Sequence, residues 1–162
     1  MADMSTPSEL SSSKNTDWQP CGAGHVAVYG TLRAGGVNDI ARLRGNMVIT
    51  GRTTLVGTLH DMGWYPGLRL QGTQEVLAEV YPLDHSLEQL LDGYEGIWPQ
   101  DMGEYTKRIA TVTVALTGGG TQTMAVLVYE ALHAAVAQTP VIAVGDWLAW
   151  FNTHKAQLQN KK

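Results

Sequence analysis

Two short segments of this 162-residue chain carry residue types that could do chemistry. In the first, Val28-Tyr-Gly-Thr-Leu-Arg33, an apolar run breaks directly into a glycine turn. Such a turn can aim consecutive backbone N–H groups into one space, where they bind a carboxylate or a developing oxyanion without a charged side chain. The segment predicts an anion-binding bend at the end of a strand. The ordinary alternative is a glycine that only lets the chain turn.

The second segment, Leu90-Leu-Asp-Gly-Tyr-Glu-Gly96, places the carboxylate of Glu95 just beyond an expected helix. Tyr94 and two glycines flank it, and aromatic, poorly solvated surroundings raise the pKa of a carboxyl group toward the range that a general base needs. The ordinary alternative is a solvated glutamate past a helix end. For Asp92, a hydrogen-bonded group at the helix end is the favoured interpretation.

Several common catalytic and binding patterns are missing from the sequence. The five histidines form no His-x-x-x-His pair and have no adjacent cysteine, so we expect neither a metal nor another cofactor. The glycine-containing loop at 30–36 lacks the Gly-Lys-Ser/Thr ending of a phosphate loop, and no Gly-x-Ser-x-Gly elbow is present. The single cysteine, Cys21, has no histidine placed to activate it, and we expect an inert thiol.

Length and composition set the class of protein. A chain of 162 residues, 44% of them hydrophobic, fits one domain with one core. A net charge of −4 argues against a nucleic-acid partner. The sequence contains no run of 18 apolar residues, so we expect no membrane span. One cysteine excludes an internal disulfide framework and fits a reducing compartment, which favours a cytoplasmic location.

The elements that position the two segments are mostly strands. Apolar or alternating runs predict strands at 25–29, 53–59, 75–81, 109–116 and 124–129, the last two forming a hairpin around Gly118-Gly-Gly120. Glycines and a proline between 59 and 75 indicate a loop, and residues 38–43 a helical turn. This pattern favours a mixed α+β domain whose sheet curls around a cavity, rather than a doubly wound parallel sheet.

Two helices are expected as well. Ser86 and Gln89 resemble a capping box for a helix that ends at Gly93. Asp146 can cap a second helix with an aromatic stripe, Trp147 to Phe151, which we expect to face the core. The polar ends predict a disordered tail at 1–24 and a polar tail at 156–162, which leaves 25–155 for the domain.

Taken in order, several stretches resemble the γ-glutamylcyclotransferase-like superfamily, in particular its branch of γ-glutamylamine cyclotransferases and AIG2-like proteins. The resemblance covers roughly residues 25 to 150, and the ordered set is more specific than any one stretch. The stretches are Tyr29-Gly-Thr-Leu-Arg33, Gly57-Thr-Leu-His-Asp61, Tyr65-Pro-Gly-Leu68, Val76-Leu-Ala-Glu-Val-Tyr81, Leu91-Asp-Gly-Tyr-Glu-Gly96, Tyr105, Met124–Tyr129 and Gly145-Asp-Trp147.

The resemblance implies a small mixed β-barrel with a few short helices around a central cavity. It also implies cleavage of a γ-glutamyl amide: the substrate's α-amine attacks its own γ-carbonyl and releases 5-oxoproline and an amine. Carried onto this chain, Glu95 is the general acid and base. The substrate-binding residues that it implies are Tyr29, Gly30, Thr31, Leu32, Arg33, Tyr65 and Tyr105. For Arg33, pairing with a substrate carboxylate and simple solvation are equally expected.

Some features depart from the pattern or leave alternatives open. Residues Ile97 to Glu104 form a longer acidic insert than the family pattern predicts, and Trp64 and Trp98 flank the site segments. Core or lid packing is the favoured role for both tryptophans, with a wall for the amine half of the substrate as the alternative. The partner is expected to be a small γ-glutamyl molecule, and the chain a monomer or homodimer. The alternative function is a non-catalytic small-molecule-binding domain of the same fold.

Overall fold

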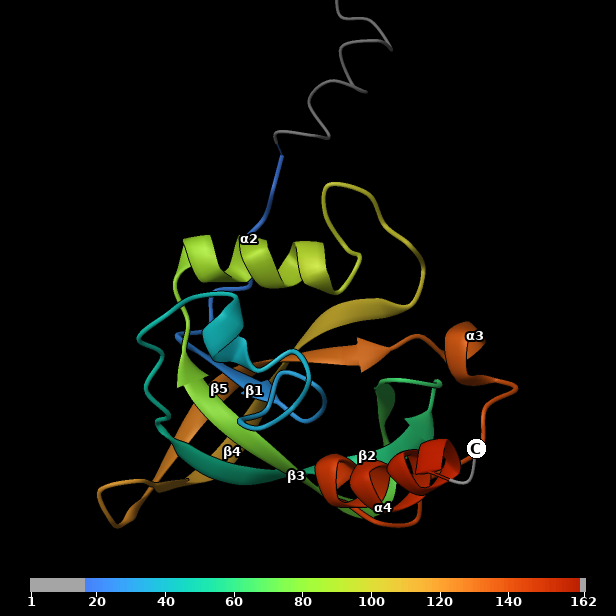
Figure 1. Cartoon of the computed structure of the whole chain (residues 1–162). Helices are drawn as coiled ribbons and strands as arrows, with labels where there is room; N and C mark the ends of the chain where they lie inside the picture. Colours follow the sequence, from blue (N-terminus) through green and yellow to red (C-terminus); the bar gives the residue numbers. More distant parts are fainter. Residues whose placement is uncertain (1–16, 161–162) are drawn as a thin grey trace, which may run out of the picture.

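The computed structural model describes residues 17–160, with side chains to Lys155, and its centre is a closed barrel of five strands (Figure 1). Around the barrel the strands follow the order β1-β3-β2-β4-β5. β1 pairs antiparallel with β3 and parallel with β5, which makes the sheet mixed. The strands are β1 (His25–Val28), β2 (Gly51–Asp61), β3 (Pro66–Pro82), β4 (Tyr105–Leu116) and β5 (Thr121–Ala131). The predicted mixed α+β barrel is confirmed.

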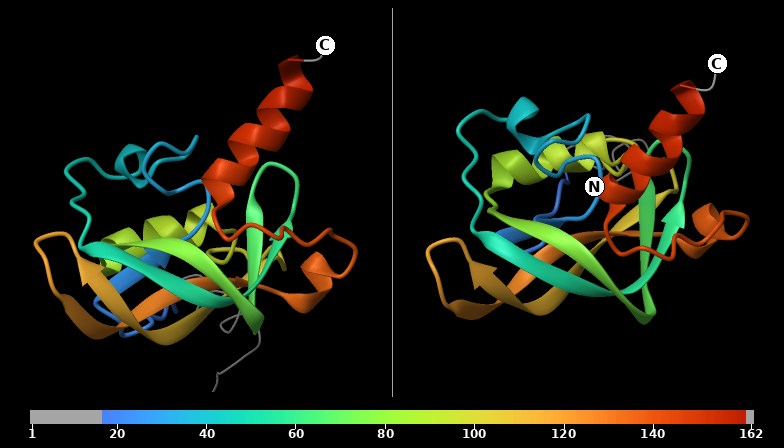
Figure 2. Two further views of the ribbon diagram at one scale, coloured as in Figure 1. Left: turned by 90° about the horizontal axis from the view of Figure 1, so that it is seen from below. Right: turned by 60° about the horizontal axis from the view of Figure 1, so that its bottom comes forward.

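Short helices pack around this barrel. They are the 3-10 turn η1 (Ile40–Arg42) and the α-helices α2 (His85–Tyr94), α3 (His133–Val136) and α4 (Trp147–Asn160). In Figures 1 and 2, α2 and α4 lie against different sides of the barrel. No helix in the described part of the chain is long and apolar enough to cross a membrane.

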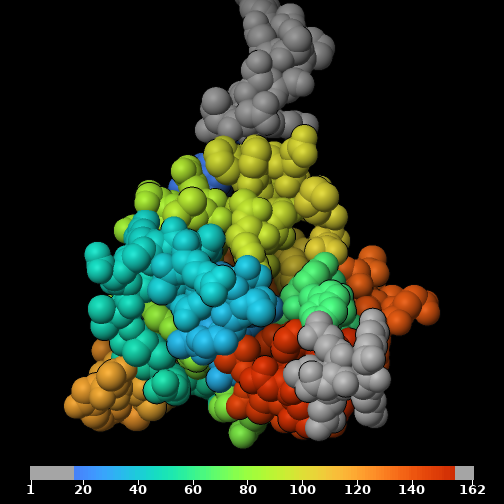
Figure 3. Space-filling view, viewed as in Figure 1, coloured from blue at the N-terminus to red at the C-terminus, as the bar shows by residue number. Residues whose placement is uncertain are grey.

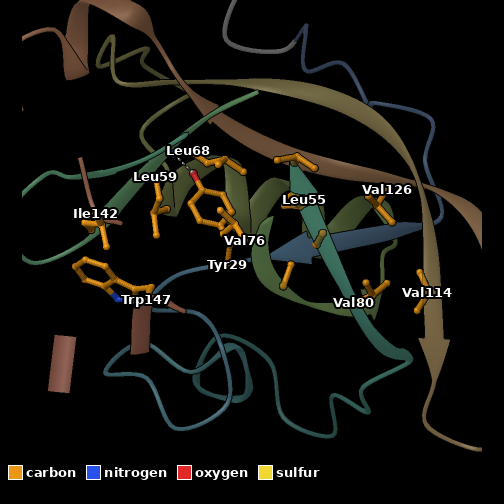
Figure 4. Close-up of a cluster of buried hydrophobic side chains, with 13 residues drawn as sticks. Tyr29, Leu55, Leu59, Leu68, Val76, Val80, Val114, Val126, Ile142 and Trp147 are labelled. Carbon is orange, nitrogen blue, oxygen red and sulfur yellow. Dashed lines mark hydrogen bonds between the residues drawn. The ribbon is translucent and has the colours of Figure 1, made fainter. Parts of the chain in front are cut away.

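The core consists of two clusters on opposite faces of the same strands. Successive side chains of a strand point to opposite faces, so Ala27 and Val126 join one cluster while Val28 and Leu127 join the other. The first cluster includes Trp147 of α4, whose side chain is 1% exposed (Figure 4). The second cluster buries the apolar side of α2. Burial on both faces explains why Val126–Tyr129 of β5 is a continuous apolar run.

The strand β3 is longer than predicted and corrects the expected loop between 59 and 75. Only the short segment between β2 and β3 turns, and β3 begins at Pro66. The register shifts after Gly57, which pairs with Gln74, while Thr58 pairs with Arg69. Gly72, with φ of 121°, lies in the extra residues of this irregularity. Glycine and proline here mark a bulge and a strand start, and not a long loop.

The caps of α2 also correct the expectation. Asp84, and not Ser86, is the N-cap, and its carboxylate accepts a hydrogen bond from the Leu87 amide at 2.8 Å. The helix continues through Gly93 to Tyr94, and Gly96, with φ of 72°, supplies the left-handed residue beyond its end. Glu95 is therefore the C-cap residue of α2.

Asp146 caps α4 as predicted, accepting from the Ala149 amide at 3.1 Å. Trp150 and Phe151 pack against the first core cluster, as expected for the aromatic stripe. The helix runs on to Asn160, so residues 156–160 of the predicted polar tail are helical, and 161–162 lie outside the described residues.

The domain begins earlier than the predicted boundary at residue 25. Residues 1–16 of the expected disordered tail lie outside the described residues, but 17–24 pack against α2. The Trp18 indole N–H donates to Asp92 at 2.7 Å, and the Cys21 amide donates to Glu88 at 2.8 Å. Lys107 of β4 reaches both of these buried carboxylates, at 2.8 and 2.6 Å. The segment is fixed because it completes this charged cluster, which composition alone does not reveal.

Candidate active site

A cavity of about 280 Å³ opens at the end of β1. Four segments surround it: the loop after β1, the turn between β2 and β3, the C-terminal end of α2, and the start of β4. In Figure 3 the blue loop, the green turn and the yellow segment after α2 come together on one face. The lining residues are Ala27, Val28, Tyr29, Gly30, Thr31, Leu32, Tyr65, Pro66, Tyr94, Glu95, Glu104, Tyr105 and Tyr129.

The loop after β1 has its carbonyls occupied and its first amides unpaired. The carbonyls of Gly30, Thr31 and Leu32 accept from later amides of the same loop, at 3.1, 3.1 and 2.9 Å. Within residues 17–160, the N–H groups of these three residues donate to no protein group. Three cavity-lining residues thus keep backbone donors available for an anionic ligand.

Gly30 allows this loop to approach the turn between β2 and β3. A Cβ atom at this position would lie 2.7 Å from Cγ of Pro66, closer than side chains pack. The glycine is therefore required by contact across the cavity edge, and not by an unusual backbone angle.

Glu95 contributes a carboxyl group to the same cavity. Its backbone amide closes the last turn of α2 by donating to the Leu91 carbonyl at 2.8 Å. The residue as a whole is half-buried, and within the described residues no donor reaches its side chain. Burial raises the pKa of this carboxyl to about 8, and the negative charges of Asp92 and Glu104 raise it further in the same direction.

Three tyrosines with internal hydrogen bonds form the wall of the cavity. The Tyr29 hydroxyl donates to the Tyr129 carbonyl at 2.7 Å and accepts from the Leu68 amide at 3.1 Å, the second bond being visible in Figure 4. Tyr105 donates to the Pro66 carbonyl at 2.7 Å, and Tyr129 donates to Asp92 at 2.7 Å. Burial raises the pKa of all three phenols, so they stay neutral and hold the wall rigid.

A hydrogen-bonded link ties the loop to the helix end next to Glu95. The Tyr94 hydroxyl lies 2.8 Å from Oγ1 of Thr31 and accepts from the Asn38 side chain at 2.7 Å. Because Tyr94 immediately precedes Glu95, this link fixes the distance between the carboxyl group and the unpaired amides.

The cavity brings together seven of the eight site residues that the sequence predicts. Arg33 is the exception and corrects the expectation. Its guanidinium pairs with Glu79 at 3.3 Å and Asp146 at 2.9 Å, its side chain is 11% exposed, and it does not line the cavity. Arg33 thus fastens the loop to β3 and to the start of α4.

Sequence reasoning missed Glu104 and Tyr129 and left Trp64 and Trp98 open. Glu104 directly precedes β4, and Tyr129 lies near the end of β5. Their positions at strand ends, close to the predicted site segments, were the signal that could have identified them. Neither tryptophan lines the cavity; Trp64 is 58% exposed and packs edge-on against Phe151. The described residues contain no group of three His, Cys, Asp or Glu side chains that could hold a metal.

Comparison with known proteins identifies the family of this chain. A curated Vibrio cholerae protein described as "Putative gamma-glutamylcyclotransferase" is 42% identical over 66 residues, which is 40% of this chain and 56% of that protein's length. An AIG2-like protein from Mus musculus matches with a TM-score of 0.58 at 22% identity, covering 77% of this chain and 88% of the other. An uncharacterized Pyrococcus horikoshii protein matches with a TM-score of 0.54 at 19% identity, covering 83% and 98%.

At these identities the two solved structures establish likeness of fold alone. The family model "Gamma-glutamyl cyclotransferase, AIG2-like" matches residues 26–149, from the first barrel strand into α4. The match includes the loop after β1, the end of α2 and every other segment around the cavity. This chain belongs to the AIG2-like gamma-glutamyl cyclotransferase family.

Proposed function

We propose that this protein is a cyclotransferase that converts a γ-glutamyl amide into 5-oxoproline and a free amine. The observation that carries the proposal is that Glu95 and three residues with unpaired backbone amides line one small cavity. Membership of the family supports the same reaction class. The cavity volume of about 280 Å³ suits a small substrate and excludes a protein chain.

The reaction needs little beyond orientation and proton transfer. The α-amine nitrogen attacks the γ-carbonyl carbon and closes a five-membered ring, and the bond from that carbon to the amine half then breaks. No water is consumed, because the nucleophile is part of the substrate. Well-oriented intramolecular reactions reach effective molarities of about 10⁵–10⁸ M, so folding the glutamyl chain back on itself supplies much of the rate.

Glu95 carries the proton in this scheme. An α-ammonium group must lose a proton before its nitrogen can attack, and the leaving nitrogen must gain one. With a pKa of about 8, the Glu95 carboxyl is close in proton affinity to an α-amine, whose ordinary pKa is about 7.7–8.0. One carboxyl can therefore accept the first proton and deliver the second.

The amides of Gly30, Thr31 and Leu32 supply the complementary anion site. They can bind the substrate's α-carboxylate or the oxyanion that forms on the γ-carbonyl oxygen. Both roles require donors that are held in place beforehand, and the hydrogen-bonded carbonyls of this loop and its link to Tyr94 provide that rigidity.

The direct test is incubation of the full-length protein with a panel of γ-glutamyl amines. We expect 5-oxoproline and the free amine to appear in equal amounts by mass spectrometry. Release of glutamate instead would indicate hydrolysis by water. Binding of these amides without any product would favour the non-catalytic binding domain.

The pH dependence of kcat/KM should report the raised pKa of Glu95. Below pH 8 the ionised carboxylate becomes scarcer, so we expect kcat/KM to fall about tenfold per pH unit, with an acidic limb near pH 8. An ordinary solvated glutamate would place that limb near its usual pKa, about 4.3. Initial rates of 5-oxoproline formation between pH 5 and pH 9 distinguish the two.

The substitution Gly30→Ala should lower kcat/KM by about 10- to 100-fold, because a new Cβ atom pushes the loop or Pro66 out of position. Gly45→Ala is the matched control, since a Cβ atom there meets nothing within 4 Å. Steady-state kinetics on both variants measures the effect. Equal rates in the two variants would show that the close approach at Gly30 does not matter for turnover.

A further inference from the structure

Acidic side chains line the cavity without a cationic side chain among its lining residues. Two of its lining residues are acidic, Glu95 and Glu104, and none is lysine, arginine or histidine. Among residues 17–160 no cationic side chain forms an ion pair with either carboxylate. The proposed substrate brings one ammonium group, the α-ammonium, and in the proposed reaction Glu95 accepts its proton.

Glu104 is held in a fixed position at this cavity. Its carbonyl accepts from the Leu132 amide at 2.8 Å, which anchors the main chain at the start of β4. The Tyr65 hydroxyl, from the turn between β2 and β3, lies 3.2 and 3.1 Å from the two carboxylate oxygens. An ionised carboxylate can accept about four hydrogen bonds, so most of this capacity is unused.

Two buried glutamates of the barrel show what a purely structural role looks like. Glu79 is paired with Arg33, and Glu130 is paired with both Arg69 and Arg108. Removing a carboxylate from water is unfavourable unless it is paired, and these residues meet that requirement within the protein. Glu104 is half-buried at the cavity wall and has no cationic partner among the described residues, which leaves its carboxylate available to a cation of the ligand.

We propose that Glu104 is a specificity-determining residue that selects γ-glutamyl amides whose amine half carries a second positive charge. The inference rests on the proposed function above. An ammonium on the amine half forms a charge-assisted hydrogen bond with Glu104 at the half-buried wall of the cavity. A carboxylate on the amine half meets like charges instead, and an alkyl group gains no such bond.

Three probes of similar size isolate the charge of the amine half: the γ-glutamyl amides of 1,4-diaminobutane, pentylamine and 4-aminobutanoate. Their distal groups are an ammonium, a methyl and a carboxylate. We expect kcat/KM to follow that order, with a gap of about 10- to 100-fold between the first two. All three share the γ-glutamyl half, so differences in the Glu95 chemistry cancel in the ratios.

Glu104→Gln should bring the ratio between the diamine and alkylamine probes close to one. Asp101→Asn is the matched control, because it removes an exposed carboxylate from the same segment without touching the cavity, and it should keep the wild-type ratio. Equal rates for the three probes in the wild type, or loss of the preference in both variants, would overturn the proposal.

A separate readout distinguishes this inference from the proposed function. If none of the probes yields 5-oxoproline, the cyclotransferase proposal fails. Calorimetric affinities of the uncleaved probes then test Glu104 directly: the ammonium probe should bind most tightly to the wild type and lose that advantage in Glu104→Gln. Indifference of the affinities to the distal charge would contradict the role of Glu104.

Discussion

Replacing Glu95 by glutamine is expected to lower kcat for 5-oxoproline release by about 10²- to 10⁴-fold. The amide side chain keeps the shape of the residue but can neither accept the proton of the α-ammonium nor deliver one to the leaving nitrogen. Single-turnover and steady-state measurements of 5-oxoproline formation, taken at pH 8, give the size of the loss.

Glu75→Gln is the control for this substitution, since it makes the same chemical change at an exposed position on β3. It should retain the wild-type kcat. If Glu95→Gln kept more than about a tenth of the wild-type kcat, the loss would be smaller than a general base usually contributes. Another group would then have to move the proton.

The same variant should be more stable than the wild type, and the gain should depend on pH. The folded pKa of Glu95, about 8, lies above the unfolded value, about 4.3, so the folded protein holds a proton that the unfolded chain releases. The stability that the neutral form contributes is complete below the unfolded pKa and is lost as the pH rises through the folded one. Glutamine cannot ionise, so the variant does not lose this stability as the pH rises.

We therefore expect almost no difference in the free energy of unfolding at pH 4, and a gain for Glu95→Gln of about 3–5 kcal/mol at pH 8. Urea unfolding at pH 4, 6 and 8 measures it, with Glu75→Gln expected to match the wild type throughout. A gain of the same size at pH 4 and pH 8 would show that ionisation of Glu95 is not its source. A site that is unfavourable for folding is typical of catalytic groups.

The elements built on strong local patterns could be predicted from the sequence. The alternation in β4 and the apolar run of β5 identified a hairpin, and a valine-rich run identified β1, because burial on one or both faces leaves a direct trace in residue type. Asp146 was identified as a cap for the same reason, since capping depends on neighbouring residues alone.

Features that depend on contacts between distant segments were missed. Arg33 was expected to bind the substrate or to be solvated, because no local pattern reveals that Glu79 and Asp146 lie within reach. Glycines between 59 and 75 indicated a loop, whereas pairing with β2 extends β3 through them. Glu104 stood only as the last residue of an acidic insert, and the closure of the barrel places it at the cavity.

The attachment of Trp18 and Cys21 to α2 affects how the protein should be produced. The indole packs against α2 and shares Asp92 with Lys107 and Tyr129. Asp92 lies at the same end of the helix as Glu95. A recombinant version that begins at His25, in the first barrel strand, would expose Glu88 and Asp92, which the native chain shields. Assays should therefore retain Trp18 and Cys21, with any affinity tag placed upstream of them.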